Sequence, residues 1–384
     1  MKTKTFGIFK FGGGAKNGII KMRGTIMKRL IFYGCVLFFF FPSVFAQEVI
    51  ENPSHPDNPD AGRTLKLEEE LRITDESGKF FFQYPRAIKV APDESLYIYD
   101  SEQLLHLDKE GHFLHNLFKK GQGPGEVNYL SNYAVMDDAI IVNGTNPGKL
   151  IFFNFEGDFQ NEISLRQFSS TLRLLFVKEG RYFFLKSDFP RSDKVSEIIG
   201  WPHVLCSMSG SMEMLEDLFD FPIETLVMGG AAVSNLSILT VLIQDRYLCV
   251  SHTAEYKIRI FDLTSHVLFR DVTRKYKRIA RPKGRKSAAI IIKGRRHEAP
   301  GSEYLTDISQ LFEFKGKLWV QTSTRNDKKG ILFDVYNIQG DYLDAFYLDA
   351  EKSVISTHKS FLFVREKDEN ELLSIVKYRV INAF

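Results

Sequence analysis

One recurring pattern constrains the fold of this chain more than any other feature of its sequence. A short apolar segment is followed by a polar turn and by a second apolar segment, which ends in Asp or Asn, two residues, and Gly or Ser. The first segments are SLYIYD (95–100), DAIIVNG (138–144), RYLCVSH (246–252) and GKLWVQTS (316–323). The second segments end at Gly111, Gly157, Ser265 and Gly340, and another apolar stretch follows each of them. Apolar residues with a period of two, bounded by turns that contain Gly, predict antiparallel β-strands.

The distances between these turns indicate a regular repeat. They are 46, 108 and 75 residues apart; the 108-residue interval is two steps of 54, and the 75-residue interval contains the 23 residues of a basic stretch, 274–296. A weaker copy, EGRYFFLKSD (179–188) with HVLCSMSG ending at Gly210, fills the skipped step. The C-terminal SFLFVREKDENELLSIVKYRVI supplies one more pair of strands, so we expect six units.

Six small antiparallel sheets predict an all-β fold, a six-bladed β-propeller, because stacking the blades in a ring buries the faces of each sheet. The 34 phenylalanines suit the wide spaces between blades. The lone segment RTLKLEEELRI (63–73) precedes the first unit, and we expect it to close the ring by pairing with the C-terminal blade. Two stacked β-sandwich domains are the alternative, and the regular register argues against them.

The N-terminal 46 residues have the order of a secretory signal peptide. Basic residues at Lys28 and Arg29 precede the apolar run LIFYGCVLFFFF (30–41), and small residues lead to a cleavage site between Ala46 and Gln47. The run is shorter than the roughly 20 residues that a membrane-spanning helix needs, so we expect no transmembrane span after cleavage. We therefore expect three parts: 1–46 as leader and signal peptide, with the true start at Met27; 47–62 as a disordered spacer; and 63–384 as the propeller with a basic insertion at 274–296.

Removing the leader reverses the sign of the net charge. Residues 1–46 contain eight of the 51 Lys and Arg and none of the 48 Asp and Glu, which leaves a net charge of −5 on the remainder. The basic isoelectric point therefore carries no argument for nucleic acid, which we do not expect as a partner. Only Cys206 and Cys249 remain, both in apolar strand-like segments, and this favours two buried thiols over a disulfide.

The run KKGQGPGEV (119–127) raises the question of a phosphate-binding loop. A P-loop places its Lys after the glycines and continues into a helix, whereas Lys119 and Lys120 precede them and no helical pattern follows. Gly-Pro-Gly suits a tight turn, since Pro presets one φ and Gly tolerates a positive one. We expect a structural turn between two blades, made by Gly121, Gly123, Pro124, Gly125 and Glu126.

At these residues the chain resembles a known family. The GQGPGE motif, together with FFFQYPRAIKVAPDESLYIYD (80–100), is similar to the NHL-like six-bladed β-propeller proteins of secreted Bacteroidetes proteomes, which have no established reaction. The resemblance covers about residues 63–384. The resemblance implies a secreted or periplasmic propeller, and it implies no activity, cofactor or catalytic residue. The basic insertion departs from the family pattern.

That insertion, 274–296, holds eleven Lys and Arg and no acid. It predicts a loop that could contact an acidic polymer, with Arg281, Lys283, Arg285, Lys286, Arg295 and Arg296 as the candidate anion-contact residues. The simpler reading is a solvated, mobile loop between blades. The central SAAIIIKG is consistent with a strand in a protruding hairpin.

Candidates for chemistry are few. His106, His112 and His115 lie within ten residues but lack a spacing that puts ligands on one strand face, so we expect no metal and no cofactor. The acidic candidates fall in predicted turns, where Asp and Asn are common for conformational reasons. They are Asp137, Asp138, Asp188, Asp193 and the run EKDENE (366–371).

The sequence therefore favours an exported, non-enzymatic recognition or scaffold propeller, in the periplasm or at the cell surface, that binds a protein or glycan. An exported polysaccharide hydrolase or lyase remains the alternative, because acids from several blades can meet in the axial funnel without leaving a local motif. Converging carboxylates or histidines in that funnel would favour the enzyme.

Overall fold

Short alternating segments form strands throughout the molecule, and Gly-containing turns separate them. The structure is a computed structural model that describes residues 48–76, 78–190, 196–211 and 215–381. Every regular element in these ranges is a strand. Among them no helix is long and apolar enough to cross a membrane. The predicted cleavage site at Ala46 and Gln47 lies outside the described residues.

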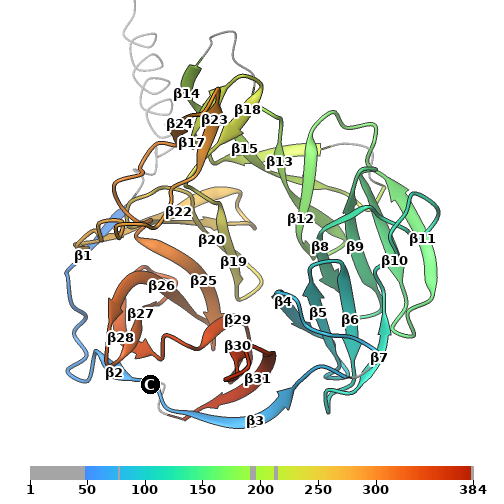
Figure 1. Cartoon of the computed structure of the whole chain (residues 1–384), viewed down its shortest axis with the longest axis horizontal. Helices are drawn as coiled ribbons and strands as arrows, with labels where there is room; N and C mark the ends of the chain where they lie inside the picture. The colour runs from blue at the N-terminus through green and yellow to red at the C-terminus, as the bar shows by residue number, and fades with distance from the viewer. Residues whose placement is uncertain (1–47, 77, 191–195, 212–214, 382–384) are drawn as a thin grey trace, which may run out of the picture. The chain divides into compact units, whose positions relative to one another are not determined.

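Six sheets of the same design surround a central axis (Figure 1). In each, the first strand lies innermost, and later strands follow outward. Blades 1 to 3 are β4 (Pro85–Val90), β5 (Leu96–Asp100), β6 (Gln103–Leu107) and β7 (Phe113–Asn116); β8 (Tyr129–Val135), β9 (Ile140–Thr145), β10 (Lys149–Phe153) and β11 (Phe159–Ser164); and β12 (Thr171–Lys178), β13 (Arg181–Ser187), β15 (His203–Met208) and β16 (Leu215–Asp220).

The second half of the ring repeats this order. Blades 4 to 6 are β19 (Leu239–Ile243), β20 (Tyr247–Ser251), β21 (Lys257–Asp262) and β22 (Val267–Arg274); β25 (Ile308–Phe314), β26 (Lys317–Asn326), β27 (Gly330–Tyr336) and β28 (Tyr342–Leu348); and β29 (Ser353–His358), β30 (Phe361–Lys367) and β31 (Leu373–Val380) with β3 (Leu67–Ile73). The all-β, six-bladed prediction is confirmed, and the blades contain the segments that define the repeat.

The N-terminal strand closes the ring as predicted. β3 pairs antiparallel with β31, with Glu68 opposite Arg379 and Ile73 opposite Ile375. β3 thus becomes the outermost strand of blade 6, so the last blade contains both ends of the propeller (Figure 1). Ring closure by distant segments removes exposed edges that would otherwise be open to pairing with other chains.

Residues 48–62 differ from the disordered spacer that the composition predicts. β1 (Val49–Asn52) pairs in parallel with β22 and adds a fifth strand to blade 4, and β2 (Arg63–Thr64) does the same beside β28 in blade 5. The Asn52 amide donates to Gly340 O at 3.0 Å and accepts from Tyr342 N at 3.1 Å. Composition misses this segment because edge pairing uses backbone groups and needs no apolar pattern.

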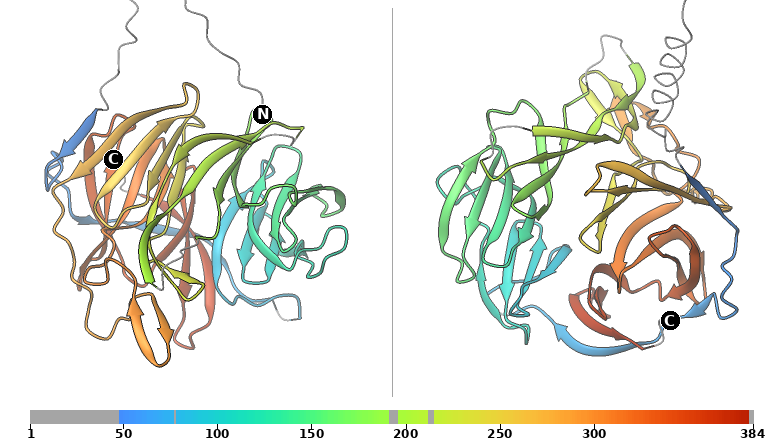
Figure 2. Two further views of the ribbon diagram at one scale, coloured as in Figure 1. Left: turned by 90° about the horizontal axis from the view of Figure 1, so that it is seen from above. Right: turned by 180° about the vertical axis from the view of Figure 1, so that it is seen from behind.

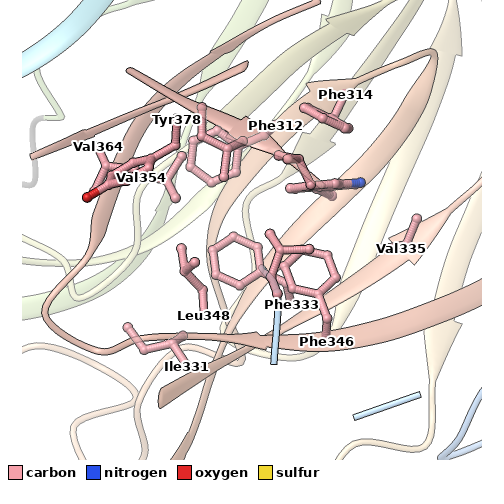
Figure 3. Packing of buried hydrophobic residues seen from close by; sticks show 14 of the residues in the cluster. Phe312, Phe314, Ile331, Phe333, Val335, Phe346, Leu348, Val354, Val364 and Tyr378 are labelled. Atoms are coloured by element: carbon pink, nitrogen blue, oxygen red, sulfur yellow. The ribbon is translucent and has the colours of Figure 1, made fainter. Parts of the chain in front are cut away.

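Aromatic side chains fill the spaces between blades, as the phenylalanine content suggests. Between blades 5 and 6, the ring of Trp319 lies 4.2 Å from Phe314 and 4.7 Å from Phe346, centroid to centroid. The ring of Phe333 stacks on that of Phe346 at 5.3 Å (Figure 3). Such offset and edge contacts add to the free energy of burial. Cys206 and Cys249 are free and buried, which confirms two thiols over a bridge.

Two excursions from the ring form a small satellite. β14 (Ser196–Trp201), β17 (Ile223–Met228) and β18 (Ala231–Val233) make one sheet, and β23 (Ala289–Ile292) with β24 (Arg295–Glu298) makes a hairpin. Leu226, Met228 and Ile290 form their shared apolar cluster. Figure 2 shows the hairpin, in orange, extending beyond the strands of the blades.

Candidate functional site

The innermost strands of all six blades surround a cavity of about 810 Å³ on the propeller axis. Blade 4 contributes an apolar wall from Ile238 to Leu242, interrupted by Thr240. The other blades contribute apolar and polar side chains. The charged and histidine residues in the lining are Arg86, Lys89, Arg173, Glu313 and His358.

Lys89 belongs to the innermost strand of blade 1, β4. Its ammonium group donates to the carbonyl of Tyr133, on blade 2, at 2.6 Å and lies 5.1 Å from the centre of the Tyr133 ring. Burial lowers the pKa of Lys89 to about 8, because the charged form loses hydration. Lys89 therefore joins two blades and brings a positive charge into the channel at neutral pH.

Arg173 belongs to β12 of blade 3 and is half-buried, whereas its strand neighbours Leu172 and Leu174 are buried on the opposite face of the sheet. Burial lowers the pKa of Arg173, although a guanidinium keeps its charge at any physiological pH. Arg173 also lowers the pKa of the buried His203, an effect smaller than that of burial itself. No carboxylate among the described residues forms an ion pair with Arg173.

Arg86 is more exposed than these two cations. Its guanidinium carbon lies 5.6 Å from the ring centre of Tyr84 and 6.0 Å from that of Tyr99. Arg86 and Lys89 come from the same strand, three residues apart, so blade 1 presents two cations to the channel.

On the far side of the ring, Glu313 is the one carboxylate in the described lining. Its side chain accepts a hydrogen bond from the backbone of Gly316 at 2.6 Å, and its carbonyl accepts from the Thr357 hydroxyl. His358 has a pKa that burial, followed by Lys359 and Lys377, lowers. Glu313 therefore stabilises a turn through its side chain and a contact between blades 5 and 6 through its backbone carbonyl. Because the described lining contains three Lys or Arg residues and this one carboxylate, the channel is electropositive.

The glycine run lies between β7 of blade 1 and β8 of blade 2. Gly123 N donates to the Glu126 carboxylate at 3.0 Å, and Gly125 N donates to Glu162 at 3.1 Å. The buried Lys149 donates to Gly123 O at 2.7 Å and to Glu162 at 2.8 Å. The carboxylates of Glu126 and Glu162 thus accept hydrogen bonds from the backbone N–H groups that a bound phosphate would need. This favours a structural turn over a phosphate-binding loop.

The three histidines do not come together as a set. Nδ1 of His106 lies 3.3 Å from Nε2 of His115, and its Nε2 lies 3.0 Å from the Ser95 hydroxyl. His112 instead lies 3.0 Å from the Asp108 carboxylate and is exposed. In the described part of the chain no group of three His, Cys, Asp or Glu side chains could hold a metal ion.

The acidic candidates also lie apart from the channel lining. Asp137 and Asp138 are exposed in a turn, and the carbonyl of Asp188 accepts from the Trp201 indole. Glu366, in the EKDENE run, accepts hydrogen bonds from Arg72 and Tyr378. Asp193 is outside the described residues.

The six candidate anion-contact residues divide into two groups. Arg281 donates to the carbonyls of Ser302 and Tyr304, and Arg296 donates to Glu298 and to the Ser287 carbonyl, so both hold the backbone. The other four, whose side chains are exposed and have no hydrogen bond or ion pair to any described residue, are Lys283, Arg285, Lys286 and Arg295.

The insertion contains the hairpin of β23 and β24, and the residues on both sides of this hairpin are hydrogen-bonded to Asn235. Asn235 accepts from Ala288 N at 2.9 Å and donates to Pro300 O at 2.9 Å, so both ends of the hairpin are fastened to the satellite. The channel cations Arg86, Lys89 and Arg173 are not among the residues predicted from sequence. The sequence feature that could have revealed these residues is a Lys or Arg within the otherwise apolar first strand of a unit. PRAIKV and TLRLLFVK are the two examples.

Comparison with known proteins agrees with this architecture. A family model described as DUF5128, 6-bladed beta-propeller, matches residues 74–199. A candidate exported protein from Bacteroides fragilis aligns with a TM-score of 0.55 at 14% identity, over 87% of this chain and 100% of its own. A member of the DUF4221 family from Bacteroides vulgatus aligns with a TM-score of 0.54 at 10% identity, over 84% of this chain and 99% of its own.

No curated protein matches the chain. At these identities, the solved structures show a shared fold and no more. The resemblance to exported Bacteroidetes propellers is confirmed by the family match and by both structures. The chain is therefore a six-bladed β-propeller, and its residues 74–199 carry the pattern of the DUF5128 family.

Proposed function

We propose that this chain is an exported recognition protein that binds a small ligand, such as a glycan segment, in its axial channel. The observation that carries the proposal is the cavity of about 810 Å³ lined by all six blades. Small-molecule sites in proteins typically measure about 300–1,000 Å³ and combine apolar walls with a few polar groups. A folded protein partner is too large to enter, so the channel suits a glycan segment or one end of a peptide.

Export to the periplasm or the cell surface is part of the proposal. The basic, apolar and small residues of positions 28–46 support it, as does the structural relative named as a candidate exported protein. Expressing the full chain with a C-terminal tag and fractionating the cells tests it. Recovery of the tagged protein in the cytoplasm, with residues 1–46 still attached, would contradict export.

The alternative, a hydrolase or lyase acting on polysaccharide, has no specific observation in its favour. Glycoside hydrolysis in most families uses two carboxyl groups about 5–10 Å apart. The described lining contains Glu313 as its one carboxylate, and that group already accepts a backbone hydrogen bond. Recognition therefore fits the channel better than hydrolysis.

A channel-filling substitution tests the site directly. Thr240 lines the cavity from the apolar wall of blade 4, so Thr240→Trp would fill part of it. The matched control is Ser169→Trp, which places the same side chain at an exposed position between blades 2 and 3. In a screen of mono- and oligosaccharides by calorimetry, Thr240→Trp should abolish binding and Ser169→Trp should preserve it. Equal binding by both variants would exclude the channel.

A further inference from the structure

The inference starts from Arg173, a cation in the channel that has no partner among the described residues. Its guanidinium carries up to five N–H donors, yet it makes no hydrogen bond, ion pair or ring contact with any other described residue. Arg173 is half-buried, and a charge that is partly withdrawn from water is destabilising unless an opposite charge or hydrogen bonds compensate for it. A charged group of this kind that lines a cavity is a candidate for ligand binding.

Lys89 is the second channel cation whose N–H donors are not all used by the described residues. One of its three protons goes to the Tyr133 carbonyl at 2.6 Å, which leaves two donors unused by the described residues. This hydrogen bond and the Tyr133 ring, whose centre lies 5.1 Å from Nζ of Lys89, hold the ammonium group in place. A ligand that contacts Lys89 would therefore meet a donor that is already positioned.

The two cations occupy one side of the ring. Lys89 comes from blade 1 and Arg173 from blade 3, and Asn132 of blade 2 lies on the strand between theirs, where its amide donates to Leu174 O at 2.6 Å. The wall from blade 4 is apolar, with Leu239, Val241 and Leu242 in the lining. The channel thus has cations on the side of blades 1 to 3, an apolar wall from blade 4, and a mixed polar and apolar lining from blades 5 and 6.

We infer that the axial channel binds an organic carboxylate, with the carboxylate on the side of Arg173 and Lys89 and the less polar part of the ligand against blade 4. This inference rests on the proposed function and specifies its ligand. A planar guanidinium matches a carboxylate because two parallel N–H groups can meet its two oxygens. Uronic acids, which combine a carboxylate with a sugar ring, belong to the class that fits.

Calorimetry with three matched sugars tests the assignment at pH 7 and low salt. Galacturonate should bind at least tenfold more tightly than galactose, because only the former has a carboxylate. Galactose 6-phosphate is the third probe, and tighter binding of it than of galacturonate would overturn the carboxylate assignment. No detectable binding of galacturonate to the wild-type protein would overturn it as well.

Arg173→Met supplies a second readout. It should weaken galacturonate binding at least tenfold while the melting temperature stays the same or rises, because it removes a charge that the protein does not compensate. Arg166→Met, at an exposed position outside the lining, is the control and should change neither. Unchanged galacturonate binding by the Arg173→Met variant would contradict the inference.

The failures of the two proposals are distinguishable. Equal binding of galactose and galacturonate, both lost in Thr240→Trp, would overturn the carboxylate preference and leave channel recognition standing. Galacturonate binding that survives Thr240→Trp would place the ligand elsewhere and overturn both.

Discussion

Nε of Arg274 lies 3.0 Å from Oδ2 of Asp334, with both side chains almost fully withdrawn from solvent. Asp334 also accepts hydrogen bonds from the hydroxyl groups of Tyr256 at 2.6 Å and Tyr342 at 2.7 Å. The guanidinium carbon lies 5.0 Å from the centres of the Tyr256 and Tyr276 rings and 5.2 Å from that of Tyr342. This cluster joins blade 4 to blade 5. The first residue of the basic run is therefore part of the core and is not available to a partner.

Removing one member of this buried pair should be costly. We expect Asp334→Ala to lower the free energy of unfolding by about 3–5 kcal/mol, because it leaves the Arg274 charge buried without its counter-ion. The control is Glu371→Ala, which breaks the exposed Lys367–Glu371 pair and should cost less than about 0.5 kcal/mol. Urea denaturation measures both. Similar values for the two variants would contradict the structural role of the pair.

The glycine turn makes a second prediction, which concerns Gly121 and Glu126. A Cβ at position 121 would overlap the Glu126 carboxylate, which folds back to accept from Gly123 N. Gly121→Ala should therefore cost about 1–3 kcal/mol. In a Glu126→Ala background the same change should cost less, since the overlapping group is gone. Equal costs in the two backgrounds would show that the contact does not matter, and a rise in melting temperature with ATP would reopen the phosphate interpretation.

The repeat could be predicted from sequence because its signals are local. Alternation, Gly turns and spacing all lie within single units, and even ring closure by 67–73 follows from a strand left over before the first unit. The channel could not be predicted in this way, because Lys89 and Arg173 are 84 positions apart in the sequence. They line the same cavity only after blades 1 to 3 have stacked. Charge composition likewise grouped Arg274, Arg281 and Arg296 with exposed neighbours, although each is held by the folded backbone or core.

Binding of an anion in the channel should depend on pH through Lys89. Since burial lowers the pKa of Lys89 to about 8, the group is charged at pH 7 and neutral at pH 9. Galacturonate affinity should therefore fall as the pH rises through 8, and galactose affinity should not. Lys89→Met should bind galacturonate more weakly and remove this pH dependence. An unchanged slope between pH 7 and pH 9 in Lys89→Met would assign the titration to another group.

Acid should destabilise blade 1 through its histidine pair. Burial first, and then His115, lower the pKa of His106 to about 4, so the folded state resists protonation that the unfolded chain accepts near 6.5. Stability is therefore lost as the pH falls from 6.5 towards 4, by about 2 kcal/mol at pH 5 for His106 alone. His106→Gln should be less stable at pH 7 but lose less between pH 7 and pH 5. His55→Gln, at an exposed position, should behave like the wild type.

The exposed cations of the insertion should bind an acidic polymer without contributing to the fold. Lys283, Arg285, Lys286 and Arg295 have no side-chain partner among the described residues, so replacing all four with Gln should leave the melting temperature unchanged. The same variant should elute from a heparin column at lower salt, because four charges that contact the polymer are lost. Arg281→Gln and Arg296→Gln together should instead lower the melting temperature, since their guanidinium groups donate to backbone carbonyls. Unaltered elution of the fourfold variant would show that the polymer contacts another surface.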